Sequence, residues 1–163
     1  MGLLVIEAGR RIARGMSAKE IYQEVSALTA HSHASFILDT LEFMHAGGRC
    51  SAVTALGANL LRLKPCIEVD NLRGGAMSVG KKYRGSLEKV LPQYTRDKLA
   101  DRADLVLDRV FITHSGISQN YIDLVRSTIQ QIADFREICV TRASCTISCH
   151  CGPNTLGVLF LTK

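Results

Sequence analysis

Six short runs of apolar and β-branched residues constrain the fold more than any other feature of this sequence. They lie at 35–38, 66–70, 76–81, 110–113, 138–141 and 158–161. Most are separated by segments of helical periodicity, which favours some parallel pairing. The polar, Gly-rich segment 71–75 instead predicts an antiparallel hairpin. The chain is therefore predicted to be an α/β protein of the α+β type, a two-layer domain with a mixed sheet of about six strands and helices on one face.

The first 33 residues have helical periodicity and are predicted to form a helical pair in front of the sheet. Segment 2–14 is apolar at helical spacing. Ser17 and Glu20 then form a capping box, in which each side chain satisfies a free amide at the start of the next helix. We therefore divide the chain into a helical linker over 1–33 and a sheet domain over 34–163.

Composition excludes several classes of function. The net charge is +5 and the pI is about 9.0, but the chain has no Trp and only 6% aromatic residues. The basic residues are scattered and few aromatic side chains are present on which bases could stack, which argues against nucleic-acid binding. The positive net charge favours an anionic ligand or an acidic partner. No apolar run approaches the ~18 residues of a membrane span. The first residues do not resemble a signal peptide, so we expect a cytoplasmic protein.

Six cysteines in a cytoplasmic chain are expected to be reduced thiols. Four potential zinc ligands lie close together, at Cys145, Cys149, His150 and Cys151. The last three are adjacent, and neighbours in an extended segment point in alternate directions. We therefore predict no metal site and no cofactor, with a zinc module as the alternative.

The segment around His150 is the strongest candidate for binding an anion. Gly152 permits close backbone approach, and Pro153 suits the first position of a helix, whose free amides would face an anion. His150 would donate from beside this helix. The alternative is a histidine that bonds a loop carbonyl. Arg49 follows a Gly-Gly turn and is a second candidate carboxylate ligand, unless it only holds its own loop.

Two other places could contact a ligand or partner. Lys82 and Arg84 belong to the only basic cluster, which follows a predicted strand and could dock an acidic partner or simply face solvent. His114 ends the 110–113 strand at a predicted cleft rim, although such a histidine is more often bonded within its loop.

Five segments in order along the chain resemble the DegV family of bacterial fatty-acid-binding proteins. They are FILDTLEFMHAGGRCS, LLRLKPCIEV, KKYRG, VFITHSG and HCGPNTLGVLFL. The resemblance implies a second α/β domain with a mixed six-stranded sheet, without the first domain that supplies further carboxylate contacts. With that partner domain missing, we expect part of the first helix to be exposed, at Leu3, Leu4 and Val5.

The resemblance also implies a function. Such proteins are non-catalytic carriers that hold a long-chain fatty acid and present it to a separate kinase for phospholipid synthesis. By this resemblance His150 lies on the carboxylate side, Arg49 lies near the head group, and Arg84, with Lys82, lies on the kinase-facing surface. The apolar helices at 41–46 and 52–63 would line an acyl tunnel against the sheet. We assign to this tunnel Phe36, Leu38, Leu41, Met44, Ala55, Leu56, Leu60 and Ile67.

Two further alternatives to the carrier remain open. One is a truncated structural domain without a ligand. The other is a kinase-like domain of the dihydroxyacetone kinase superfamily, for which we locate no phosphate ligands in the sequence. A carrier needs little more than apolar burial, since each buried CH₂ contributes about 0.8 kcal/mol.

Overall fold

The computed structural model describes residues 1–48 and 63–163. The elements in these residues are, in order, α1 (Gly2–Ala13), α2 (Ala18–Ala27), the 3-10 turn η1 (Leu28–His31), β1 (Ser32–Ile37), α3 (Glu42–Ala46), β2 (Leu63–Asp70), the 3-10 turn η4 (Asn71–Arg73), β3 (Ala76–Arg84), α4 (Leu87–Leu99), β4 (Leu105–His114), α5 (Gln119–Ile132), β5 (Ile138–Arg142), α6 (Cys145–Cys151) and β6 (Leu156–Thr162). The helix predicted at 52–63 lies outside the described residues except for Leu63, which begins β2.

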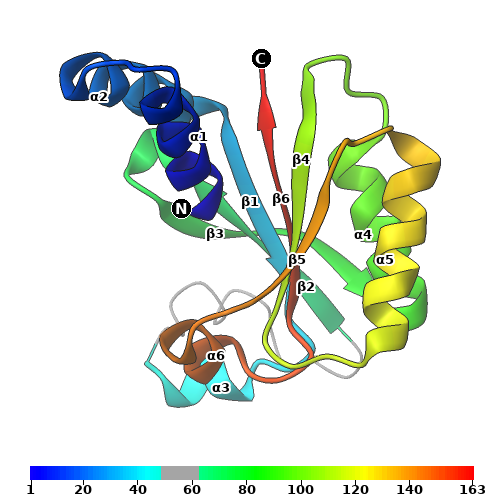
Figure 1. Ribbon diagram of the computed structural model, residues 1–163. Helices are drawn as coiled ribbons and strands as arrows, with labels where there is room; N and C mark the ends of the chain where they lie inside the picture. The colour runs from blue at the N-terminus through cyan, green and yellow to red at the C-terminus, as the bar shows by residue number, and fades with distance from the viewer. Residues whose placement is uncertain (49–62) are drawn as a thin grey trace.

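The strands of the described residues form one six-stranded sheet in the order β3-β2-β1-β6-β4-β5 (Figure 1). Only β4 and β5 pair in parallel, and α5 connects them. The other four neighbouring pairs are antiparallel. The predicted mixed sheet is therefore confirmed, and the hairpin predicted around segment 71–75 is the β2–β3 pair.

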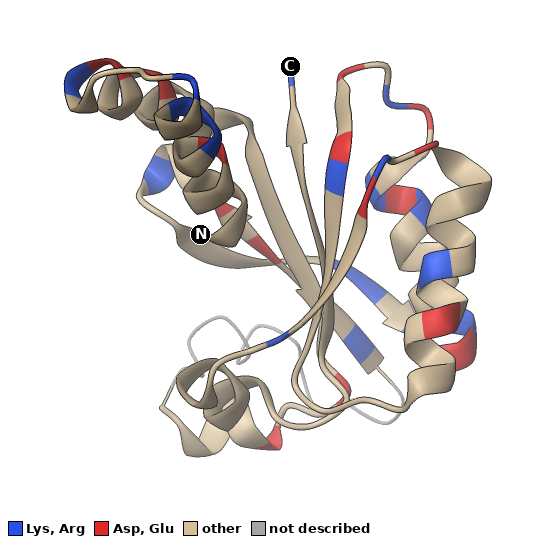
Figure 2. Ribbon diagram, viewed as in Figure 1, with Lys and Arg blue, Asp and Glu red and all other residues tan. Residues whose placement is uncertain are grey.

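The sequence explains why β1 and β6 lie inside the sheet. Both strands, which the structure describes in full, are built without Lys, Arg, Asp or Glu (Figure 2). β1 pairs with β2 on one side and with β6 on the other. Strands bordered on both sides expose no sheet edge, so they do not need the charged side chains that keep edge strands from pairing with other chains.

The main core lies between the sheet and the helices α4 and α5, which cover one face (Figure 1). Tyr94 of α4 is fully buried there. Its hydroxyl donates to the carbonyl of Ser35, 2.7 Å away, and accepts the amide of Val158 at 3.0 Å. Burial raises the pKa of Tyr94 far above its ordinary value. The phenol therefore bridges β1 and β6 as a neutral group.

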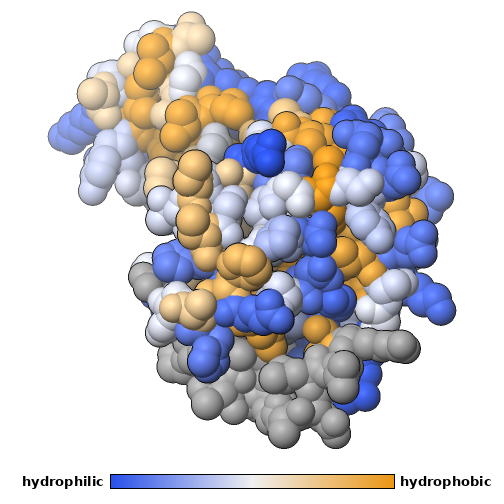
Figure 3. Space-filling view, turned by 90° about the horizontal axis from the view of Figure 1, so that it is seen from below, coloured by the Kyte–Doolittle hydropathy of each residue, from blue (hydrophilic) through white to orange (hydrophobic). Residues whose placement is uncertain are grey.

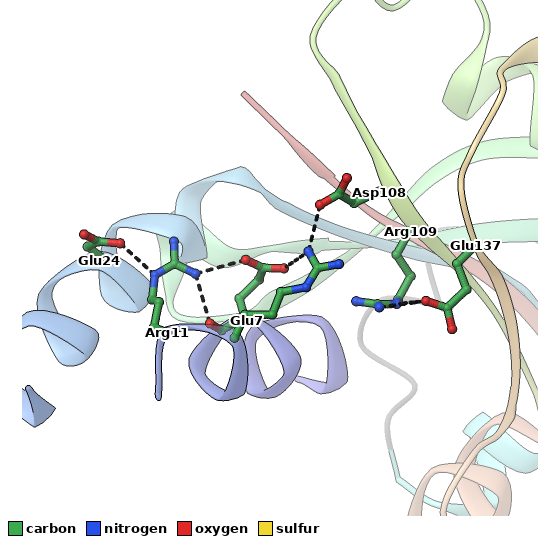
Figure 4. Close-up of polar contacts among 7 residues, drawn as sticks. Glu7, Arg11, Glu24, Asp108, Arg109 and Glu137 are labelled. Carbon is green, nitrogen blue, oxygen red and sulfur yellow. Dashed lines mark hydrogen bonds and ion pairs between the residues drawn. The ribbon is translucent and has the colours of Figure 1, made fainter. Parts of the chain in front are cut away.

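Charged side chains connect the helix α1 to the sheet and to α2. Arg10 contacts both Glu7, at 2.9 Å, and Asp108 of β4, at 2.7 Å (Figure 4). Arg11 joins Glu7 to Glu24 of α2. These pairs are partly exposed, so each contributes little alone. Together they orient α1 and α2 with respect to the sheet.

The apolar face of α1 is exposed in part, and the expectation for one residue was wrong. Val5 is 64% exposed, as predicted, whereas Leu3 is only 5% exposed. The capping box of α2 is confirmed: the amide of Ser17 donates to Glu20 at 2.8 Å, and the Ser17 hydroxyl accepts the Glu20 amide. Every residue of α2 is exposed or half-buried. The pair therefore adds little to the main core.

Among the residues that the structure describes, the helices are too short or too polar to cross a lipid bilayer.

Candidate functional site

A small apolar cluster lies apart from the main core, on the other face of the sheet. Phe36 and Leu38 flank Ile37 along the chain, so they point away from the core that Ile37 joins. The cluster consists of four buried residues and three half-buried residues packed against them, namely Leu38, Met44, Ile67, Cys151, Phe36, Leu41 and Val79. We call this set the small apolar cluster.

Five of the predicted acyl-pocket residues belong to this cluster: Phe36, Leu38, Leu41, Met44 and Ile67. They come from β1, the segment that follows it, α3 and β2. The other three, Ala55, Leu56 and Leu60, lie outside the described residues, as does Arg49. Sequence reasoning missed Val79 and Cys151. The strand periodicity of β3 and the apolar nature of a neutral thiol were the available signals for them.

The helices α3 and α6 pack closely because two glycines leave room for two rings. A Cβ atom built on Gly47 would lie 2.6 Å from Nδ1 of His150. A Cβ atom built on Gly152 would lie 2.5 Å from the ring of Phe43. Any larger side chain at either glycine would have to displace the facing ring. Each helix therefore places an aromatic ring on a glycine that follows the other helix.

The structure corrects the prediction that a helix begins at Pro153. The helix is α6, which begins after Ser144 and ends at Cys151. The Ser144 hydroxyl accepts the amide of Ile147, and Gly152 adopts a φ of 76°, which ends the helix. Pro153 then follows a helix end, where proline is also common. His150 consequently lies in the last turn of α6, and no helix N-terminus faces it at Pro153.

His150 nevertheless has an unusual environment. Its Nδ1 atom is buried and has no hydrogen-bond partner among residues 1–48 and 63–163. Buried polar atoms are nearly always paired, so such an atom in a folded protein needs an explanation. The next residue, Cys151, belongs to the small apolar cluster. The residue with the unpaired ring nitrogen therefore directly precedes a member of the small apolar cluster along α6.

Hydrogen bonds tie the turn that follows α6 to neighbouring loops, and Lys64 holds one of the acceptors, Asp39, in place. Asp39 accepts from the side chain of Asn154 at 3.1 Å and from Lys64 at 2.5 Å. The amide of Asn154 donates to the carbonyl of Gly116 at 3.1 Å, and the Ser115 hydroxyl donates to the carbonyl of Gly152. Sequence reasoning did not identify Asp39, because its partner Asn154 is 115 residues away. These bonds hold the end of α6, and with it His150, against the sheet.

His114 is hydrogen-bonded within its own turn. This matches the interpretation of a histidine bonded within its loop, not that of a ligand at a cleft rim. Its Nδ1 atom accepts the amide of Gly116 at 3.2 Å. The ring is therefore the Nε2–H tautomer when neutral. Burial, and then the charge of Arg142, lowers the pKa of His114 below its ordinary value.

The predicted partner surface lies at the end of the edge strand β3. Lys82 and Arg84 are exposed, and neither has an ion pair among the residues that the structure describes. Their neighbour Lys81 is paired with Asp97 at 2.6 Å, and Tyr83 points inward and donates to the same carboxylate at 2.7 Å. Strand alternation explains why the buried Tyr83 lies between the two exposed cations.

The cysteines near His150 are distributed around a helix, not along the extended segment that we expected. Cys145 and Cys149 are exposed, whereas Cys151 is buried. Within the described part of the chain, no three His, Cys, Asp or Glu side chains gather as metal ligands. The five cysteines that the structure describes are all free thiols.

The end of the molecule that carries α3 and α6 exposes hydrophobic residues among polar ones (Figure 3). Phe43 of α3 is 37% exposed and Ile147 of α6 is 52% exposed. The apolar character of this end is therefore not confined to the buried cluster.

Comparison with known proteins identifies the family. The family model described as an uncharacterised protein of the DegV family matches residues 1–163. A DegV domain-containing protein of Deinococcus radiodurans is 30% identical over 147 residues, which cover 89% of this chain and 50% of the relative.

Two solved structures share the fold. One is a DegV family protein from Thermus thermophilus, described for its fatty acid binding, with a TM-score of 0.79 and 24% identity over 99% of this chain and 56% of that chain. The other is the fatty acid kinase B3 protein of Streptococcus pneumoniae loaded with linoleic acid, with a TM-score of 0.80 and 19% identity over 99% of this chain and 55% of that chain. The chain thus spans about half the length of the relatives it matches. Because the family match extends over all of residues 1–163, the chain belongs to the DegV family.

Proposed function

We propose that this chain binds a long-chain fatty acid, with the acyl chain against the small apolar cluster and the carboxylate near His150. The observation that carries the proposal is the buried, unpaired Nδ1 of His150, the residue that directly precedes the cluster member Cys151. A carboxylate oxygen would satisfy this nitrogen by accepting its proton in a charge-assisted hydrogen bond. The names of the Thermus and Streptococcus relatives, which include fatty acid binding and linoleic acid, support the same ligand class.

Apolar burial would provide most of the binding free energy. Each CH₂ that leaves water contributes about 0.8 kcal/mol, so a long acyl chain needs few polar contacts. The cluster supplies apolar side chains from the sheet, from α3 and from α6. Arg49 would lie near the head group in this proposal, and Ala55, Leu56 and Leu60 would extend the apolar wall.

We further propose that the chain is a non-catalytic carrier, which presents the bound acid to a separate fatty-acid kinase. The name of the Streptococcus protein, a fatty acid kinase B3 protein, supports this role. Lys82 and Arg84, which are exposed and have no ion pair among the described residues, would form the kinase-facing surface and meet an acidic partner.

The test is titration of oleic acid into the wild type, His150→Ala and His45→Ala. His45 is an exposed histidine of α3, so its substitution is the matched control. His150→Ala is expected to weaken binding by about 1–3 kcal/mol, because it removes one hydrogen bond to a charged group. His45→Ala should bind as the wild type does. Equal affinity in all three chains would remove His150 from the site. A wild type that binds no fatty acid and releases none on denaturing extraction would overturn the carrier proposal.

A further inference from the structure

The outer surface of α6 carries two exposed thiols, Cys145 and Cys149. Side chains four residues apart lie on the same face of a helix, with Cβ atoms about 5–6 Å apart. Cys151, two residues further, faces the small apolar cluster and is buried. The two exposed thiols therefore form a pair on a surface of α6 other than the one that carries Cys151 into the small apolar cluster.

The number of ligands that a metal ion requires decides which metal two thiolates can bind. Zinc takes four protein ligands in structural sites and three plus water in catalytic sites. Across residues 1–48 and 63–163 no group of three His, Cys, Asp or Glu side chains offers this. Thiolates select soft ions such as Cu(I), for which two sulfur ligands in a linear arrangement are sufficient. That arrangement needs the sulfurs roughly 4.6 Å apart, twice a metal–thiolate bond of about 2.3 Å. Cβ atoms about 5–6 Å apart, each with its Sγ one bond away, are compatible with this separation.

We propose that Cys145 and Cys149 form a two-coordinate binding site for a soft monovalent metal ion of the Cu(I) type. Each thiol loses one proton to solvent and forms one metal–sulfur bond. One Cu(I) and two thiols thus give a bis-thiolate complex of charge −1 and two protons, and the metal keeps its oxidation state. The bridge would span one turn of α6.

The other cysteines that the structure describes are poorer ligands. Burial raises the pKa of the Cys66 thiol to about 11, and Cys151 is buried within the small apolar cluster. Cys139 is half-buried, donates to Glu137 at 3.2 Å, and has a pKa raised by burial and by that carboxylate. These features make it harder for the three thiols to lose the proton that metal binding displaces.

The test is an anaerobic titration of Cu(I) against the competing chelator bicinchoninate. The wild type should hold one Cu(I) per chain in this competition, with release of protons. Cys145→Ser and Cys149→Ser should each weaken the affinity at least 100-fold, because a single thiolate remains. Cys139→Ser should leave the affinity unchanged. If either α6 variant holds Cu(I) as tightly as the wild type, the assignment is overturned.

A second variant separates the geometry of the pair from the number of thiols. Cys149→Ser combined with Ile147→Cys keeps all six thiols but places one about 200° around the helix from Cys145. Ile147 is 52% exposed, so its substitution leaves the core intact. This chain should lose affinity as Cys149→Ser does, with an unchanged circular dichroism spectrum. Retained affinity, or equally tight binding of Zn(II) by the wild type, would contradict a two-coordinate site on one helix face.

Discussion

The ring of His150 rests on Gly47 so closely that a Cβ atom there would lie 2.6 Å from Nδ1. Gly47 has a φ of −77°, which any residue adopts, so Gly47→Ala tests the contact without backbone strain. We expect Gly47→Ala to displace the ring of His150 and to weaken fatty-acid binding about as much as His150→Ala does.

Gly9→Ala is the matched control for this substitution, because a Cβ atom at Gly9 of α1 has nothing within 4 Å. It should bind as the wild type does and gain up to ~1 kcal/mol of stability from helix propensity. Oleic acid titration and thermal unfolding of the three chains measure both effects. Wild-type affinity in Gly47→Ala would show that the position of His150 does not matter for binding.

Reversal of charge at the end of β3 should affect the proposed kinase and spare the ligand. We expect Lys82→Glu combined with Arg84→Glu to slow acyl-phosphate formation by a fatty-acid kinase at least tenfold, because like charges oppose an acidic partner. Oleic acid affinity should be unchanged. Arg14→Glu combined with Lys19→Glu, two exposed cations near the turn between α1 and α2, changes the net charge equally and is the matched control. Equal rates for both variants would remove the β3 cations from the partner surface.

Removal of the buried phenol should destabilise the sheet. Tyr94→Phe leaves the carbonyl of Ser35 and the amide of Val158 without the hydroxyl that both contact. We expect the free energy of unfolding to fall by about 1–3 kcal/mol, the cost of buried groups that lose a partner. Tyr22→Phe is the control, because Tyr22 is 74% exposed. Denaturant unfolding of both variants gives the comparison, and equal stabilities would contradict the bridging role.

The stability of the fold should depend on pH through His33. Its ring stacks on Phe160, with centroids 5.1 Å apart, and Nε2 is 3.1 Å from the hydroxyl of Thr162. Burial lowers the pKa of His33 below its ordinary value of 6.5, and the charge of Arg102 lowers it further. The unfolded chain therefore binds a proton more readily, so stability is full above about pH 6.5 and falls as the pH falls below it.

Thermal unfolding between pH 7.5 and 5 measures this dependence. His33→Gln should flatten it, because the side chain no longer titrates. His114→Gln should flatten it in the same direction, since burial also lowers the pKa of His114. A wild type that becomes more stable as the pH falls over this range would contradict the sign.

Features that depend on residues close together in the chain could be predicted from the sequence. The Ser17 and Glu20 side chains bond each other's backbone within one turn, and the Gly-rich segment 71–75 predicted the β2–β3 hairpin. The segment around Pro153 was ambiguous because proline follows helix ends as well as helix starts. Ser144, three residues before Ile147, was the cap that indicated the correct helix. Asp39 could not be identified, because its bond to Asn154 depends on how distant strands are brought together.

The alternation along β1 has a consequence for ligand selectivity. Ile37 packs in the main core while Phe36 and Leu38 face the small apolar cluster, so one strand belongs to both layers. A sheet that shifted to enlarge the lipid side would open voids around Ile37, and close-packed interiors resist such voids. The strands beneath the small apolar cluster are therefore expected to move little. If the small apolar cluster takes an acyl chain as proposed, adjustment to chains of different length or unsaturation would fall to α3 and α6, whose rings pack on each other's glycines.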